Sequence, residues 1–161
     1  MPATAVKPKA IKVKMAGIDF AESPAVLETL LGSCVGIAVW DRKGKRGGLA
    51  HVVLDNSRGN TNLPGKYADT AVAELKKRLV SMGSSPSALV AKLAGGATMF
   101  GKRSDRDVGE RNYRAVLEHL QKHGIRAIAE HIGGDKGRMI AFDTDNGAVT
   151  VSIARQVVTV L

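Results

Sequence analysis

The chain contains very few cysteine and aromatic residues. Cys34 is the only cysteine among 161 residues, which excludes an intramolecular disulfide and a metal site built from several cysteines. Aromatic residues make up only 4% of the sequence, so the core is expected to consist mainly of Val, Ile, Leu and Ala. No aromatic side chains alternate with the basic residues, as stacking on single-stranded nucleic acid would require.

Long apolar runs are also missing. The longest extends from Val35 to Trp40, far short of the roughly 20 residues that a membrane-spanning helix needs. The N-terminal segment is basic but has neither an apolar block nor a small-residue cleavage site, so no secretory signal is expected. Together with the single free cysteine, these features predict a cytoplasmic protein without membrane insertion.

Positive charge is in excess, because the chain has 24 Lys and Arg residues and 15 Asp and Glu residues, which gives a net charge of +9. Such a balance favours an acidic partner, namely nucleic acid, anionic lipid or a Glu-rich protein surface, but it also suits a protein that is merely kept soluble by its charge. Neither helix-turn-helix nor zinc-finger spacing occurs. Specific nucleic-acid binding is therefore not expected.

The length predicts a single domain at 10–161, preceded by a mobile basic arm at 1–9 that carries two prolines. Apolar residues at helical spacing predict helices at 67–82 and 110–123. Alternating or continuous β-branched runs predict the following strands: 11–15, 26–31, 35–40, 49–54, 88–93, 125–129, 139–142 and 149–153, with 157–161 as a candidate edge strand. This pattern predicts a mixed α/β domain with much antiparallel pairing.

The strands at 35–40 and 49–54 are joined by turn residues and are predicted to form a hairpin. A two-residue loop at 42–43 would place Cys34 directly opposite His51, and one at 43–44 would place the two on a diagonal of the same face. A three-residue loop would put them on opposite faces. The seventeen-residue separation is therefore compatible with contact but does not establish it.

Cys34 is a candidate nucleophile. A free cysteine often serves as a small buried hydrophobe, but Cys34 follows Gly32 and Ser33 at the edge of an apolar run. A tight turn there can expose the thiol and direct backbone N–H groups at one point, as an oxyanion hole requires. His51, a polar residue in an apolar strand, is either a satisfied core histidine or the base that accepts the thiol proton. Thr29 is either an ordinary strand residue or the group that orients the imidazole.

His119 and His123 are four residues apart on a predicted helix, a spacing that can bind a metal ion. No third ligand is evident, and the glutamate of the zinc-protease motif is absent. Their positive charge suits the last turn of a helix instead. The sequence therefore predicts neither a metal site nor a cofactor site.

Five short stretches occur in order and at ordinary spacings. They are Thr29-Leu30-Leu31-Gly32-Ser33-Cys34-Val35, Ala50-His51, Pro64-Gly65-Lys66-Tyr67-Ala68-Asp69, Gly95-Gly96-Ala97-Thr98-Met99-Phe100 and Arg111-Asn112. Together they resemble the CheD family, the chemoreceptor glutamine deamidases of bacterial and archaeal chemotaxis. The resemblance extends over roughly residues 26–134.

The resemblance implies hydrolysis of the side-chain amide of receptor glutamines to glutamate, with release of ammonia and without a metal or organic cofactor. It implies a Cys–His–Thr catalytic set, which falls here on Cys34, His51 and Thr29, with Gly32 and Ser33 in the loop that holds the substrate oxyanion. It also implies a fold similar to that of deamidating toxins, with packed β-sheets flanked by helices. The implied partners are chemoreceptors and, in some organisms, the phosphatase CheC. The alternative is a non-catalytic adaptor that binds receptors or a CheC-like partner.

Overall fold

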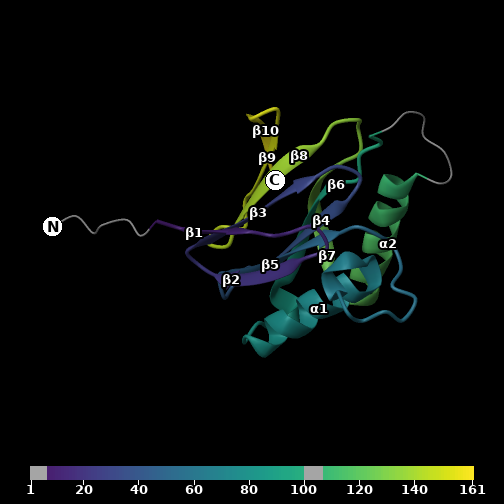
Figure 1. The fold of residues 1–161 in the computed structure, drawn as a ribbon. Coiled ribbons are helices and arrows are strands. Elements are labelled where there is room, and N and C mark those ends of the chain that lie inside the picture. The colour runs from purple at the N-terminus through teal and green to yellow at the C-terminus, as the bar shows by residue number, and fades with distance from the viewer. Residues whose placement is uncertain (1–6, 100–106) are drawn as a thin grey trace.

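Ten strands of the computed structural model form two five-stranded sheets within the residues that it describes, 7–99 and 107–161 (Figure 1). Sheet 1 contains, in spatial order, β1 (Lys9–Lys12), β3 (Ala25–Leu31), β8 (Arg138–Asp143), β9 (Val149–Ile153) and β10 (Gln156–Val160). Sheet 2 contains β2 (Ile18–Glu22), β5 (Arg46–Val52), β4 (Val35–Asp41), β6 (Leu89–Gly95) and β7 (Arg126–Ile132). The β1–β3 and β6–β7 pairs are parallel and the others antiparallel. The predicted mixed α/β fold with largely antiparallel sheets is confirmed.

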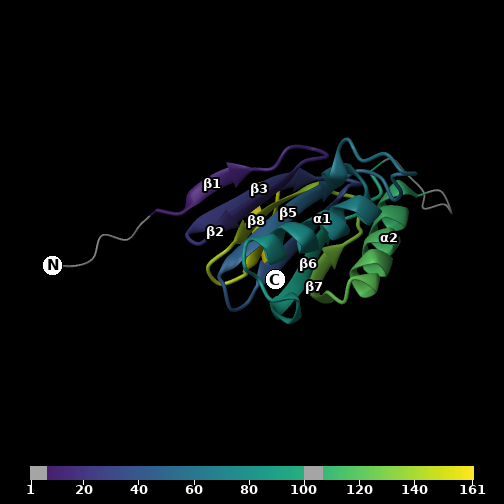
Figure 2. The same cartoon turned by 90° about the horizontal axis from the view of Figure 1, so that it is seen from below.

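Two α-helices cover the same face of sheet 2. α1 (Ala68–Ser81) and α2 (Val108–Lys122) lie side by side in both views (Figure 1, Figure 2). Short 3-10 helices precede α1 at Pro64–Lys66 and β6 at Pro86–Ala88. The predicted helical spacing places one apolar stripe of α1 in the core, formed by Ala68, Ala71, Val72, Leu75 and Leu79. Neither described helix combines the length and the apolar character needed to cross a membrane.

The side chains of β4 point alternately into two cores, as strand geometry dictates. The core beneath the helices includes Val35, Ile37 and Val39 of this strand, with Ala50 and Val52 of β5. The core between the sheets includes Cys34, Ala38, Leu49 and Ala94 from the side of sheet 2, and Leu27, Leu31, Ile140, Phe142, Val149 and Val151 from sheet 1. The molecule thus has three layers, with the helices outermost, sheet 2 in the middle and sheet 1 on the other side.

The N-terminal strands differ from the prediction. β1 lies at Lys9–Lys12 rather than at 11–15, and β2 at Ile18–Glu22 is a strand that the local pattern does not predict. Both depend on distant partners, because β1 pairs in parallel with β3 and β2 pairs with β5. Residues 1–6 of the predicted arm lie outside the described residues, and Lys9, its last residue, already pairs with Ala25.

Candidate active site

The register of the β4–β5 hairpin places Cys34 and His51 on the same face of sheet 2. Gly36 pairs with His51 and Val35 with Val52, the diagonal arrangement of the three that the sequence leaves open. The connection differs from the two-residue loop predicted for this register, since residues 42–45 join the last pair, Asp41 and Arg46. The carboxylate of Asp41 accepts hydrogen bonds from the N–H groups of residues 43 and 44 at 2.9 Å each, which stabilises the longer turn.

Cys34 ends a three-residue bend, Gly32 to Cys34, that leads directly into β4. Its side chain is 9% exposed and packs in the core between the sheets. Gly95 lies beneath this bend with φ +106°, and a Cβ there would collide with the Cys34 carbonyl oxygen. The Gly95-Gly96 pair singled out in the sequence therefore allows two backbones to approach each other behind the cysteine.

His51 is buried at 3% exposure, and its position is determined by both backbone and side-chain contacts. Its N–H donates to the Gly17 carbonyl at 2.9 Å, and its own carbonyl accepts from the Ala16 N–H at 3.1 Å. Its ring Nδ1 lies 2.7 Å from the Thr29 hydroxyl oxygen. Thr29 lies on the same face of β3 as the inward-facing Leu27 and Leu31, because side chains two residues apart in a strand share a face, so its side chain also lies between the sheets.

The hydrogen bonds of Thr29 determine which nitrogen of His51 carries the proton. The hydroxyl donates its single hydrogen to the Val13 carbonyl at 2.8 Å, and a carbonyl can only accept. The same oxygen must therefore accept from Nδ1–H of His51. The neutral imidazole then carries a lone pair on Nε2, the nitrogen that is free to take up a proton.

Nε2 of His51 is buried and has no hydrogen-bond partner within 7–99 and 107–161. The structure therefore brings Thr29 to His51 and places Cys34 on the same face, but it forms no hydrogen bond between the thiol and the imidazole. Diagonal neighbours on a sheet are typically about 7–8 Å apart at their Cα atoms, within reach of long side chains.

Burial acts on the two titratable groups in opposite directions. It raises the pKa of the Cys34 thiol, an effect partly offset by the backbone N–H of the same residue. It lowers the pKa of the His51 imidazole. Both groups are therefore neutral in the free protein near pH 7, and no thiolate–imidazolium pair is favoured. With both groups neutral at rest, transfer of the thiol proton to the imidazole would accompany attack on a substrate.

The histidine pair considered as a metal site lies at the C-terminal end of α2. No group of three His, Cys, Asp or Glu side chains that suits a metal ion occurs in the described part of the chain. His119 belongs to the last turn of α2, and the backbone of His123 caps that helix. The pair is thus part of a helix end.

Comparison with known proteins gives an independent result. The sequence model of the family described as "CheD chemotactic sensory transduction" matches residues 53–153, more than half of the chain. The chain belongs to the CheD family.

Curated CheD proteins resemble the chain over most of its length. A "Probable chemoreceptor glutamine deamidase CheD" from Methanococcus vannielii is 47% identical over 91% of this chain and 97% of its own length. The "Chemoreceptor glutamine deamidase CheD" of Thermotoga maritima is 44% identical over 81% of this chain and 83% of its own length. Among solved structures, a Neisseria meningitidis protein of the DUF152 family has a TM-score of 0.46 and 11% identity, covering 78% of this chain and 63% of that one.

Two buried polar residues beside the CheD motif residues were not predicted as site residues. Asn112, part of the motif that resembles CheD, is 1% exposed and donates to the carbonyls of Val53 and Ser33. Arg138 is 2% exposed and donates to His131 Nδ1 at 2.8 Å and to the carbonyls of residues 131, 133 and 136. A single polar residue in a sequence gives no signal of such burial, because the acceptors come from distant segments.

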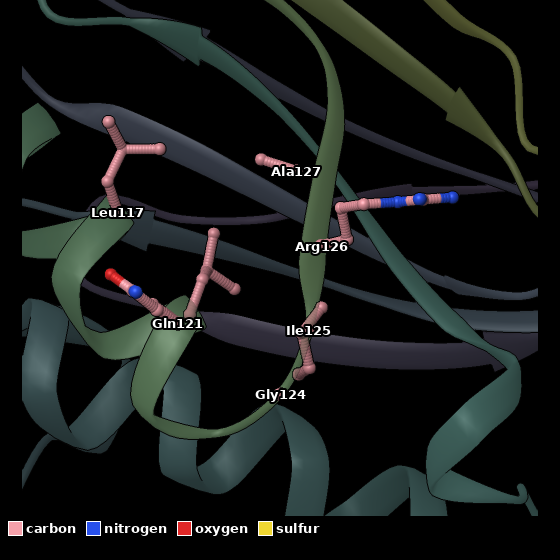
Figure 3. A pocket seen from close by; sticks show the side chains of 7 residues that line it. Leu117, Gln121, Gly124, Ile125, Arg126 and Ala127 are labelled. Atoms are coloured by element: carbon pink, nitrogen blue, oxygen red, sulfur yellow. The ribbon is translucent and has the colours of Figure 1, made fainter.

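A pocket of about 350 Å³ lies where the end of α2 meets the start of β7 (Figure 3). It is lined by Leu117, Leu120, Gln121, Gly124, Ile125, Arg126 and Ala127. Leu120 and Ile125 belong to the core beneath the helices, whereas Cys34 faces the other side of sheet 2. This pocket is therefore not the site at which a substrate would meet the CheD cysteine.

Replacement of Thr29 with valine is expected to reduce glutamine deamidation by about 10²-fold, a typical loss for a group that assists proton transfer. Valine has a similar shape but cannot accept from Nδ1–H, so the tautomer with a free Nε2 lone pair is no longer favoured. Thr29→Ser, which retains the hydroxyl, should stay within about fivefold of wild type on the same physical ground. Steady-state kinetics on a receptor fragment, with circular dichroism to verify folding, would test this. Equal activity of the valine and serine variants would contradict it.

Proposed function

We propose that this chain is a protein-glutamine deamidase that acts on the cytoplasmic helices of chemoreceptors and converts selected glutamines to glutamate with release of ammonia. The observation that carries the proposal is the Thr29–His51 contact, which leaves a buried Nε2 without a partner among the described residues, on the face of sheet 2 that also carries Cys34. Membership of the CheD family supports it, since curated relatives that cover most of the chain are named for this activity.

In the proposed first step, Cys34 Sγ attacks the carbonyl carbon of the glutamine side chain while His51 Nε2 accepts the thiol proton. A C–S bond forms and the carbonyl oxygen becomes an oxyanion. The backbone N–H groups of Ser33 and Cys34 would hold this oxyanion, with Gly32 in the bend that carries them. As the intermediate collapses, the C–N bond breaks, His51 gives its proton to the leaving nitrogen, and ammonia departs from a thioester.

In the second step, His51 Nε2 accepts a proton from water, which attacks the thioester carbonyl. The C–S bond breaks, the proton returns to the sulfur, and a glutamate side chain is released. Thr29 holds the imidazole in one tautomer throughout, because Val13 fixes the direction of its hydroxyl. Every proton transfer thus uses one nitrogen of one residue.

The proposed partner surface is acidic. A net charge of +9 suits receptor helices rich in glutamate, and association of this kind weakens as salt screens the charges. A CheC-like phosphatase is a further proposed partner, on the family resemblance alone. Both interactions would take place in the cytoplasm.

The test is direct incubation with the cytoplasmic fragment of a chemoreceptor, followed by mass spectrometry of its peptides and an ammonia assay. Wild type is expected to convert specific glutamines to glutamates, and a Cys34→Ala control should leave them unchanged. Tight binding without any conversion by wild type would overturn the proposal and favour a non-catalytic adaptor.

A further inference from the structure

The bend that carries Cys34 is held by its carbonyl groups. The Gly32 carbonyl accepts from the Ala97 N–H at 3.0 Å, and the Cys34 carbonyl accepts from the Gly96 N–H at 2.9 Å. The Ser33 carbonyl between them accepts from the side-chain amide of Asn112 at 3.5 Å. Two of the three contacts are thus made by backbone, and the middle one depends on a single side chain.

Asn112 lies at the point where the hairpin ladder ends. The last backbone pair on this side is Val35 with Val52, and beyond it the two strands separate. The Nδ2 group of Asn112 donates to the Val53 carbonyl at 2.9 Å as well as to the Ser33 carbonyl. One side-chain amide from α2 therefore connects the strand that carries His51 to the bend that carries Cys34.

The direction of the Ser33 carbonyl also sets the direction of the Cys34 N–H. Among the described residues a cis peptide occurs only at Ser23-Pro24, so the Ser33–Cys34 peptide is trans. In a trans peptide the C=O and N–H groups point in opposite directions. With the carbonyl turned toward Asn112, the Cys34 N–H points away from α2. This N–H lowers the pKa of its own thiol, which agrees with a direction toward the reacting sulfur.

We propose that Asn112 is a positioning residue that fixes the Ser33–Cys34 peptide so that its N–H faces the developing oxyanion. The inference rests on the proposed deamidase function and adds to it a residue that touches neither the substrate nor the reacting atoms. Because the amide is fully buried and its two acceptors lie on different segments, no neighbouring side chain within the described residues replaces it at Ser33.

The proposal predicts that the Asn112→Asp and Asn112→Ala variants lose deamidation activity but keep the reactivity of Cys34 toward an alkylating agent. Deamidation kcat should fall by about 10²-fold with KM within about twofold, as expected when a group acts on the oxyanion rather than on substrate binding. Alkylation of Cys34 by iodoacetamide should change by less than about threefold, because displacement at a saturated carbon creates no oxyanion. The alanine variant tests the same loss without burying a charge, in case the aspartate variant does not fold.

Val116→Ala is the matched control, since Val116 lies one turn further along the buried face of α2 and is fully buried. It should lower thermal stability but leave the ratio of deamidation to alkylation as in wild type. If deamidation and alkylation fall by the same factor in Asn112→Ala, as they would in Val116→Ala, Asn112 only stabilises the helix and the proposal is wrong.

Acylation of Cys34 by 4-nitrophenyl acetate separates this inference from the proposed function, because attack on an ester also passes through an oxyanion. A wild-type protein that leaves receptor fragments unchanged would overturn the deamidase function. If it is still acylated by the ester, a loss of at least about tenfold in the Asn112 variants would uphold the positioning role. Acylation at the wild-type rate in those variants would overturn it.

Discussion

A Cys34→Ser variant is expected to lose receptor deamidation by roughly 10⁵-fold, the scale seen when the nucleophile of a hydrolase is removed. Serine has nearly the same shape, but its hydroxyl is a far weaker acid and a weaker nucleophile than a thiol. In this site the difference is large because burial lowers the pKa of His51, and so weak a base takes the proton of a thiol far more readily than that of a hydroxyl. The measurement is glutamate formation in a receptor fragment over extended incubation.

The serine variant should keep the fold of the wild type. The Cys34 side chain packs in the core between the sheets, and serine is of nearly the same size, so the exchange should shift the unfolding midpoint only slightly. Thermal unfolding and binding to the receptor fragment therefore serve as controls. Deamidation at the wild-type rate by a folded serine variant would rule out Cys34 as the nucleophile.

A His51→Gln variant is expected to lose deamidation by about 10⁴-fold, which is typical of losing the base in a coupled nucleophile–base pair. A glutamine amide can still contact Thr29, but it cannot take up a proton near neutral pH. The two neutral resting groups make the base essential, since no thiolate is stored in advance. Single-turnover measurement of ammonia release, with Thr29→Ser as a folded and active reference, would test this.

The pH dependence of deamidation and of Cys34 alkylation gives a second test of the protonation states of His51 and Cys34. Deamidation requires neutral His51, whose pKa burial lowers, so its acid limb should lie below the ordinary imidazole value of about 6.5. Alkylation by iodoacetamide requires the thiolate, whose pKa burial raises, so its rate should keep rising above about pH 8.5. A plateau of alkylation in the acidic range would reveal an ion pair at rest and contradict the neutral pair described above.

The helices illustrate what local pattern predicts well. α1 was expected at 67–82 and lies at Ala68–Ser81, because its apolar residues recur at the period of one helix face. β2 illustrates the opposite case. Ile18–Glu22 has no clean alternation of buried and exposed residues, and it is a strand because β5 offers a partner along one edge. Pairing of this kind depends on residues far apart in the sequence, such as Ile18 and Ala50, which are 32 positions apart.

The candidate site likewise combines features that the local sequence predicts with features that only the fold decides. The spacing of Cys34 and His51 is compatible with several hairpin registers. The fold adopts the diagonal one, which is one of the two that put both residues on a shared face, and Asp41 stabilises its turn. Thr29 is one polar residue in an apolar strand until the sheets pack and bring its hydroxyl to His51. The contacts of Asn112 beside Cys34 have no local signal, since its acceptors lie in the bend before β4 and just after the end of β5, far from α2 in the sequence.

The amino-acid sequence by itself determined the chemical groups that are present, the periodicity of the main helices and most strands, and the kinship with CheD. Only the tertiary structure decided the hairpin register, the protonated nitrogen of His51 and the direction in which burial moves each pKa. The physical reason is how far apart in the sequence the interacting residues lie. Periodicity is a property of neighbouring residues, whereas register, tautomer and desolvation depend on atoms that folding brings together from distant parts of the chain.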